Sequence, residues 1–153
     1  MAYPPARRIT SKLGTLHFWR LAIKPGKPLA MGHVGGVPFV GLPGNPVAAM
    51  VTFLILARPV ILKLSGRTPA RPRPYSMRAG FSVSRTAGRR EFLRARAIPG
   101  PDGIPRAVLF PSQSSAVLSS LIHCDVLVDL EEAVTSVIEG DPVPVLSLAE
   151  LVC

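Results

Sequence analysis

The spacing of hydrophobic and polar residues changes twice along the chain, near residue 45 and again after residue 66. Residues 15–23 are rich in β-forming side chains and end at a Pro-Gly turn, which predicts a strand. Two more β-forming runs, residues 28–34 and 37–42, flank Gly35 and Gly36. A Gly-Gly pair between such runs is typical of a tight two-residue hairpin, so these runs are expected to pair.

From residue 45 the apolar positions follow helical spacing: Val47, Met50, Val51, Leu54 and Ile55. Asn45 suits the N-cap of this helix, and Pro46 suits its first turn. Pro59 is expected to bend or break the helix one turn before its end, because the proline ring clashes with the carbonyl of Ile55. Gly66 is predicted to close it.

After Gly66 the pattern becomes one of short strands. Residues 67–77, RTPARPRPYSM, alternate proline with arginine and predict an extended linker. Short alternating segments then follow at residues 78–85, 90–98, 106–111, 125–130 and 142–148. We therefore predict an α/β domain over residues 1–70, followed by a small all-β, barrel-like or sandwich domain over residues 71–153.

Charge is segregated along the chain, within a formal net charge of +9. Residues 1–90 hold fifteen Lys or Arg and no Asp or Glu, whereas residues 107–153 hold seven acids and no Lys or Arg. The two parts are expected to attract each other, and the basic part offers a site for anions. Magnesium needs oxygen ligands, usually carboxylates, so the basic part is not expected to hold Mg²⁺ by itself.

Two stretches carry the strongest signals for anion binding. In KPGKP, Lys24 and Lys27 flank a Pro-Gly turn that can aim both ammonium groups at one point, although a lysine-tipped surface turn has the same pattern. In GLPGNP, Pro43 and Gly44 form a turn with little side chain, and Asn45 opens a helix whose first N–H groups favour anions. A simple turn and cap would look the same.

Other candidate chemistry is weaker. His17, His33 and His123 stand apart in the sequence, so structural or surface roles are favoured over general-base catalysis. Cys124 and Cys153 have neither metal-ligand nor disulfide spacing, which fits a reducing, cytoplasmic location. The longest apolar run, residues 47–57, is interrupted by Arg58 and Pro59, so a soluble protein without a membrane span is expected.

Residues 13–66, with KPGKP followed by GLPGNPVAAMVTF, closely resemble the molybdopterin molybdenumtransferase family, which includes the E domain of gephyrin. The resemblance continues from REFLRARAI to the C-terminus. It implies the end of a three-layer molybdopterin-binding α/β domain followed by a barrel-like domain. It also implies molybdenum cofactor biosynthesis, in which molybdate is inserted into adenylylated molybdopterin with release of AMP, assisted by Mg²⁺, in a cytoplasmic homodimer.

The resemblance assigns site residues by position. Lys24, Lys27 and Pro28 match the molybdate-contacting KPGKP, and Pro43, Gly44 and Asn45 match the loop beside it. Arg94 matches an arginine, and Ser115 a serine, that reach the anion from the second domain. Ala48 stands where many members carry serine, so one hydroxyl donor is missing.

The resemblance covers only the last part of a several-hundred-residue family protein. The acidic segment and the domains that bind metal and most of the pterin have no counterpart in residues 1–153, so the chain alone is expected to be inactive. Two alternatives remain: a non-catalytic binding or scaffolding module of the same family, and a basic nucleic-acid binder. The second is disfavoured because the chain has nine aromatic residues and no recognition motif.

Overall fold

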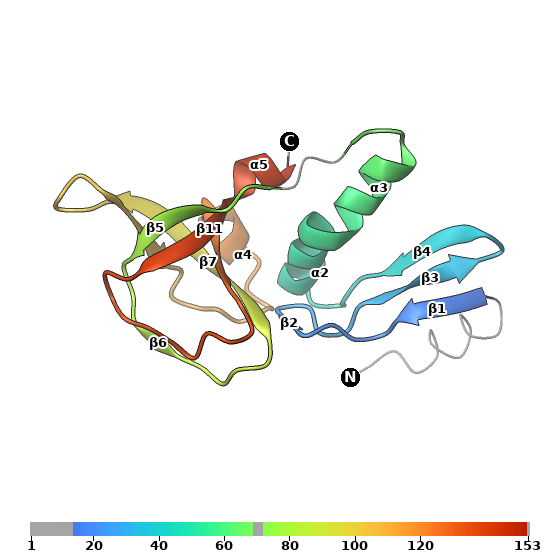
Figure 1. Ribbon diagram of the computed structural model, residues 1–153, viewed down its shortest axis with the longest axis horizontal. Helices are drawn as coiled ribbons and strands as arrows, with labels where there is room; N and C mark the ends of the chain where they lie inside the picture. The colour runs from blue at the N-terminus through green and yellow to red at the C-terminus, as the bar shows by residue number, and fades with distance from the viewer. Residues whose placement is uncertain (1–13, 69–71, 153) are drawn as a thin grey trace.

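The protein is described by a computed structural model that covers residues 14–68 and 72–152, so the predicted boundary near residue 70 lies outside the described residues. Figure 1 shows two modules side by side. In the first, one long helical segment lies along an antiparallel sheet of order β1-β3-β4. Its strands are β1 (Gly14–Phe18), β3 (Ala30–Val34) and β4 (Val37–Gly41).

The predicted hairpin is confirmed. Strands β3 and β4 pair in antiparallel register from Ala30 opposite Gly41 to Val34 opposite Val37. The two residues between them, Gly35 and Gly36, have φ angles of 56° and 80°. Both angles lie in the left-handed region that a primed turn requires, which explains why glycine occupies both positions.

The single strand predicted over residues 15–23 is wrong. Strand β1 ends at Phe18, and the chain then bends before a two-residue strand, β2 (Ile23–Lys24). β2 belongs to the other module, where it pairs in parallel with β7 (Arg90–Pro99). Local β-propensity was read correctly at both ends of the run, but it could not show that the ends join different sheets.

The helix begins at Pro46 and ends at Leu64, and of the predicted bend or break at Pro59 the break does not occur. It consists of α2 (Pro46–Thr52), a wider π-helical turn η1 (Phe53–Ala57) and α3 (Arg58–Leu64). In that turn the N–H of Arg58 donates to the carbonyl of Phe53, five residues back. The wider turn lets the chain pass Pro59, which has no N–H to contribute, so the proline falls in the first turn of α3. Gly66, with φ of 79°, closes the helix as predicted.

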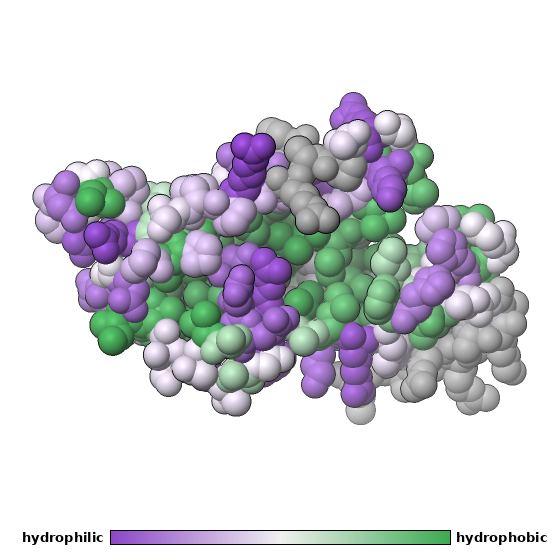
Figure 2. Space-filling model, in the orientation of Figure 1, coloured by the Kyte–Doolittle hydropathy of each residue, from purple (hydrophilic) through white to green (hydrophobic). Residues whose placement is uncertain are grey.

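This segment, Pro46–Leu64, is long and apolar enough by length and composition to cross a membrane. A single helix of this kind is weak support for a membrane span, because core helices of soluble proteins meet the same criteria. Here Val47, Val51 and Leu54 are buried against the second module. Figure 2 shows the hydrophobic surface that continues along the exposed side of the helix.

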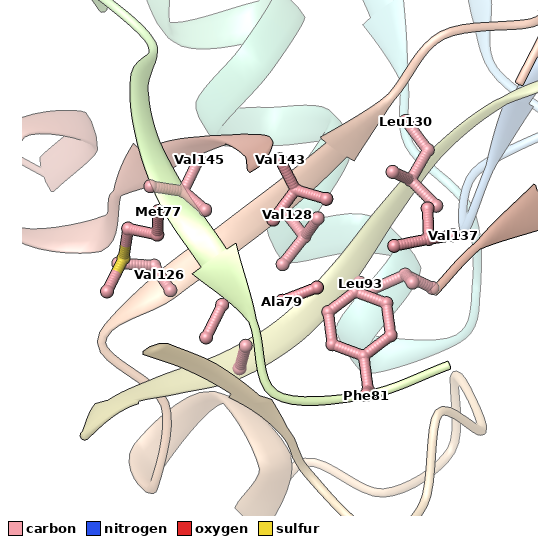
Figure 3. Packing of buried hydrophobic residues seen from close by; sticks show 12 residues of the cluster. Met77, Ala79, Phe81, Leu93, Val126, Val128, Leu130, Val137, Val143 and Val145 are labelled. Carbon is pink, nitrogen blue, oxygen red and sulfur yellow. The ribbon is translucent and has the colours of Figure 1, made fainter. Parts of the chain in front are cut away.

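The second module is a closed barrel. Strands β7, β8 (Pro105–Leu109), β5 (Tyr75–Ala79), β11 (Pro142–Ser147) and β9 (Val126–Leu130) follow one another, and β9 pairs back onto β7. Small elements complete it: β6 (Val83–Ser84) paired with β10 (Ser136–Val137), α4 (Ser119–Ile122) and α5 (Leu148–Val152). Figure 3 shows its core, in which valines of β9, β10 and β11 pack in one cluster with Ala79, Phe81 and Leu93.

Strand β7 explains how the modules are joined. Its side chains alternate, so Leu93 and Ala95 fill the barrel while Phe92 packs with Val47 and Val51 of the helix. Because both faces of β7 are covered here, the five consecutive residues 91–95 are all buried. The helix and the barrel therefore share one apolar interface.

The expected attraction between basic and acidic parts of the chain is confirmed. Arg90 donates from Nε and Nη2 to the two carboxylate oxygens of Asp129, each at 2.6 Å. This paired contact raises the pKa of Arg90, chiefly through the hydrogen bond.

Candidate functional site

One open pocket lies at the junction of the two modules. It receives the KPGKP turn, the GLPGNP loop and the segment 112–115, hereafter the serine loop. Its lining comprises Ile23, Lys24, Pro25, Gly26, Lys27, Pro28, Pro43, Gly44, Asn45, Ala48, Arg89, Gln113, Ser114 and Ser115. Segments about seventy residues apart in sequence therefore form one site.

The KPGKP turn is fixed to the barrel through β2. Lys24 lies in β2, and its Nζ is 3.2 Å from Oε2 of the buried Glu91 on β7. Gly26 has a φ of 123°, and a Cβ there would collide with the side chain of Thr52. Only glycine satisfies both conditions, so the turn is built for close packing on the helix. Lys27 lines the pocket and stays exposed to solvent.

Asn45 opens the helix, but its side chain does not cap it. The expected bond from the side-chain oxygen to the first helical N–H groups is not made. Instead, Asn45 Nδ2 donates to Ser115 Oγ at 2.9 Å, and the N–H of Val47 donates to the carbonyl of Ser115 at 3.3 Å. The GLPGNP loop is thus tied to the serine loop of the other module.

The serine loop is bonded to Arg94 of β7, through the side chain of Gln113 and through two loop carbonyls. The amide of Gln113 accepts from the N–H of Arg94 at 3.0 Å and donates to its carbonyl at 2.9 Å and to that of Phe110 at 3.0 Å. The Arg94 guanidinium donates to the carbonyls of Ser112 and Ser114, at 3.3 and 3.2 Å. Arg94 is 1% exposed, and burial lowers the pKa of its guanidinium.

The structure brings together every residue predicted for the site except Arg94. Lys24, Lys27, Pro28, Pro43, Gly44, Asn45 and Ser115 all line the pocket. Arg94 instead lies under the serine loop, within reach of its carbonyls rather than among the lining residues. Ser114, the neighbour of the predicted Ser115, also lines the pocket, and sequence reasoning missed Arg89 and Gln113. Gln113 stands two positions before Ser115 and could have been indicated by it, whereas nothing distinguished Arg89 from the other arginines of residues 1–90.

The chemistry of the pocket suits an anion. Lys24, Lys27 and Arg89 contribute three cations, and among the residues that the structure describes no carboxylate lines it. A magnesium ion does not fit these residues, because it prefers carboxylate oxygens. Throughout residues 14–68 and 72–152, no group of three or more His, Cys, Asp or Glu side chains could hold a metal ion.

Two histidines that stand apart in the sequence are neighbours in the structure. His17 Nε2 and His33 Nδ1 lie 3.0 Å apart on the exposed side of the β1–β3 pair, and neither residue lines the pocket. His123 stacks on Phe110 with ring centroids 6.4 Å apart. Neither arrangement includes a nucleophile, so the structural or surface roles expected for these histidines remain the preferred interpretation.

Comparison with known proteins defines the class of each module. Residues 6–63 match the family described as "Probable molybdopterin binding domain", and residues 76–148 match the MoeA C-terminal region, domain IV. The chain is therefore an α/β module of the family described as "Probable molybdopterin binding domain", followed by a MoeA-type C-terminal module. The fold class predicted from the sequence is confirmed.

Relatives of the whole chain agree. A molybdopterin molybdenumtransferase of Haemophilus influenzae is 34% identical over 140 residues, which is 91% of this chain and 35% of the relative. Molybdopterin molybdenumtransferase 1 of Mycobacterium tuberculosis is 34% identical over 151 residues, 94% of this chain and 35% of the relative. The crystal structure of a molybdopterin biosynthesis MoeA protein from Pyrococcus horikoshii superposes with a TM-score of 0.74 at 32% identity, covering 92% of this chain and 34% of that one.

The chain belongs to the molybdopterin molybdenumtransferase family, and it spans about a third of the length of the relatives it matches.

Proposed function

We propose that the pocket between the two modules is the molybdate-binding part of a molybdopterin molybdenumtransferase site. The whole reaction would insert molybdate into adenylylated molybdopterin and release AMP. The observation that carries the proposal is the convergence of Lys24 and Lys27 with the GLPGNP and serine loops around one pocket without lining carboxylates.

Molybdate is a tetrahedral dianion, and the pocket offers matching donors on opposite sides. Lys24 and Lys27 supply ammonium groups whose three protons each can reach separate oxygens. Ser114 and Ser115 supply hydroxyls from the barrel side, and Gly44 leaves room beside the backbone. Arg94, predicted to reach the anion, is proposed to act through the serine loop instead, because its guanidinium is already bonded to that loop.

The remaining parts of the reaction are assigned to regions of the relatives beyond the match. These would supply the carboxylates for Mg²⁺ and most of the surface for the pterin nucleotide. The proposal also carries over the homodimeric state and cytoplasmic location that the resemblance implies. It follows that the 153-residue chain alone binds molybdate but does not insert it.

A binding and turnover experiment tests this. The purified chain is titrated calorimetrically with sodium molybdate, beside Lys27→Ala and the control Lys63→Ala, an exposed lysine of α3. Lys27→Ala should weaken binding about tenfold through loss of a charge-assisted contact, and Lys63→Ala should not. Absence of binding by the unaltered chain, or equal binding by both variants, contradicts the proposal.

The same chain is then supplied with adenylylated molybdopterin, molybdate and Mg²⁺, and cofactor and AMP are measured. We expect neither product. Turnover by the chain alone would contradict the proposal that insertion needs regions beyond the match, but it would not contradict the proposal that the pocket binds molybdate. Stable association with a partner protein without molybdate binding would instead favour a scaffolding role.

A further inference from the structure

We infer that Asn45 is a positioning residue that acts through Ser115, holding the Ser115 hydroxyl as a hydrogen-bond donor toward the bound oxyanion. The inference rests on the proposed function, because it concerns how one donor of the molybdate pocket is prepared. It assigns Asn45 a role different from direct contact with the anion.

The first observation is that the side chain of Asn45 makes no cap bond to the helix it opens. Asparagine is among the preferred N-cap residues because its side-chain oxygen satisfies a free N–H of the first helical turn. Asn45 occupies that position, with φ of −76° and ψ of 130°, yet makes no side-chain cap bond. Its amide is directed instead across the junction to Ser115, a residue seventy positions away. The favourable local contact is replaced by one between modules.

The second observation is the direction of the bond. Asn45 Nδ2 donates and Ser115 Oγ accepts, at 2.9 Å. A serine hydroxyl has one proton to donate and two lone pairs with which to accept. Accepting from Asn45 leaves that proton available, and among the hydrogen bonds within the described residues Ser115 Oγ donates none. Both residues line the pocket, so an oxyanion there is a suitable acceptor.

The third observation is that Ser115 is held at more than one point. Its carbonyl accepts from the N–H of Val47, and its neighbour Gln113 is bonded to both backbone groups of Arg94. The serine loop is thus fixed to β7 on one side and to the start of α2 on the other. With the backbone fixed, the bond from Asn45 restricts the remaining freedom of the hydroxyl. Preorganised donors of this kind bind an anion without a further ordering cost.

A double-mutant cycle tests the inference, with sodium molybdate as the probe. Calorimetric titrations are made on the unaltered chain, Asn45→Ala, Ser115→Ala and the double variant. Ser76→Ala, an exposed serine of β5, serves as the control for loss of a hydroxyl. Ser115→Ala is expected to weaken binding about tenfold and Asn45→Ala severalfold. The double variant should bind within twofold of Ser115→Ala, because Asn45 acts only through that hydroxyl.

A second variant separates positioning from mere support of the fold. Asn45→Asp keeps the size of the side chain, but an ionised carboxylate can only accept, so the Ser115 hydroxyl would donate its hydrogen bond to it, and negative charge would be added to the pocket. It should bind molybdate more weakly than Asn45→Ala, while circular dichroism and the urea midpoint show the same folded state for both. Equal affinity of the two variants would contradict the inference.

The outcomes are distinguishable from failure of the proposed function. If the unaltered chain does not bind molybdate, the proposed function is wrong and this inference falls with it. Two results would overturn only the role of Asn45 if the unaltered chain binds molybdate. The first is an unchanged molybdate affinity of Asn45→Ala, and the second is a loss of affinity in the double variant equal to the product of the two single losses. A loss of molybdate affinity in the double variant no larger than that of Ser115→Ala supports the role of Asn45.

Discussion

Lys24 Nζ lies 3.2 Å from Glu91 Oε2, so one of the two lysines at the pocket is bonded to the first carboxylate in the chain. Arg85 Nε lies 3.5 Å from the other oxygen of Glu91. Glu91 itself is 6% exposed and sits on β7, outside the pocket lining. It therefore orients Lys24 from behind while reducing the positive charge that an anion would experience.

Replacing Glu91 with glutamine should have opposite effects on binding and stability. Loss of the carboxylate raises the positive potential of the pocket, so molybdate is expected to bind severalfold more tightly at low salt. The same change removes the partner of two cations and should lower the free energy of unfolding by about 1.5–3 kcal/mol. Titration and urea unfolding measure both. The control Asp102→Asn, in an exposed pair with Arg106, should change stability by less than about 1 kcal/mol.

Restoring a hydroxyl at position 48 is expected to strengthen the site. Ala48 is 3% exposed and lines the pocket on the first turn of α2. Ala48→Ser adds one donor facing the anion and should tighten molybdate binding severalfold. Ala49→Ser, one residue further along the helix, is the matched control and should leave affinity unchanged. Equal affinities for the two serine variants would mean that position 48 does not face the bound anion.

The interface between helix and barrel depends on Phe92. This side chain is 2% exposed and packs in one cluster with Val47, Val51 and Leu127. Phe92→Ala should reduce the free energy of unfolding by about 3–5 kcal/mol, because it opens a cavity between the modules. Ile122→Ala, at a position 76% exposed, should change it by less than about 0.5 kcal/mol. A small effect of Phe92→Ala would show that the modules do not share a core.

Cys124 makes stability depend on alkaline pH. Burial raises the pKa of its thiol from about 9 to about 11, with Arg94 opposing the shift. Between these values the unfolded chain loses the proton while the folded chain retains it, so the free energy of unfolding should fall as pH rises from about 9 to about 11. Urea unfolding at pH 8 and pH 10 should show a smaller decrease for Cys124→Ala than for the unaltered chain. Equal decreases would mean that the thiol titrates alike in both states.

Sequence patterns predicted the local elements well where the cause was local. Gly35 and Gly36 specified the hairpin turn, and Pro46 and Gly66 marked the helix ends, because each acts through its own backbone geometry. The course of the chain at Pro59 was missed, since a π-helical turn depends on how the whole helix packs. The split of residues 15–23 was missed for the same reason: pairing of Ile23 with Arg90 is a long-range choice.

The candidate site also has features that the sequence predicts locally and features that depend on contacts between distant residues. The lysines of KPGKP and the bare GLPGNP loop were recognisable because charge and missing side chains are visible in the sequence. The role of Gln113 was not, because two of its three hydrogen bonds go to Arg94, a residue of β7 nineteen positions earlier. Asn45 was expected to cap a helix, and only the fold places Ser115 where it competes for that amide.

The central claim is that an oxyanion binds between Lys27 and Ser115, and anomalous diffraction tests it most directly. Crystals of the chain grown with sodium molybdate would be measured on both sides of the molybdenum absorption edge. The account predicts an anomalous peak in the junction pocket, within hydrogen-bond reach of Lys27 Nζ and Ser115 Oγ, that is lost in Lys27→Ala crystals. A peak elsewhere, or none in a molybdate-saturated crystal with the pocket open to solvent, would contradict it.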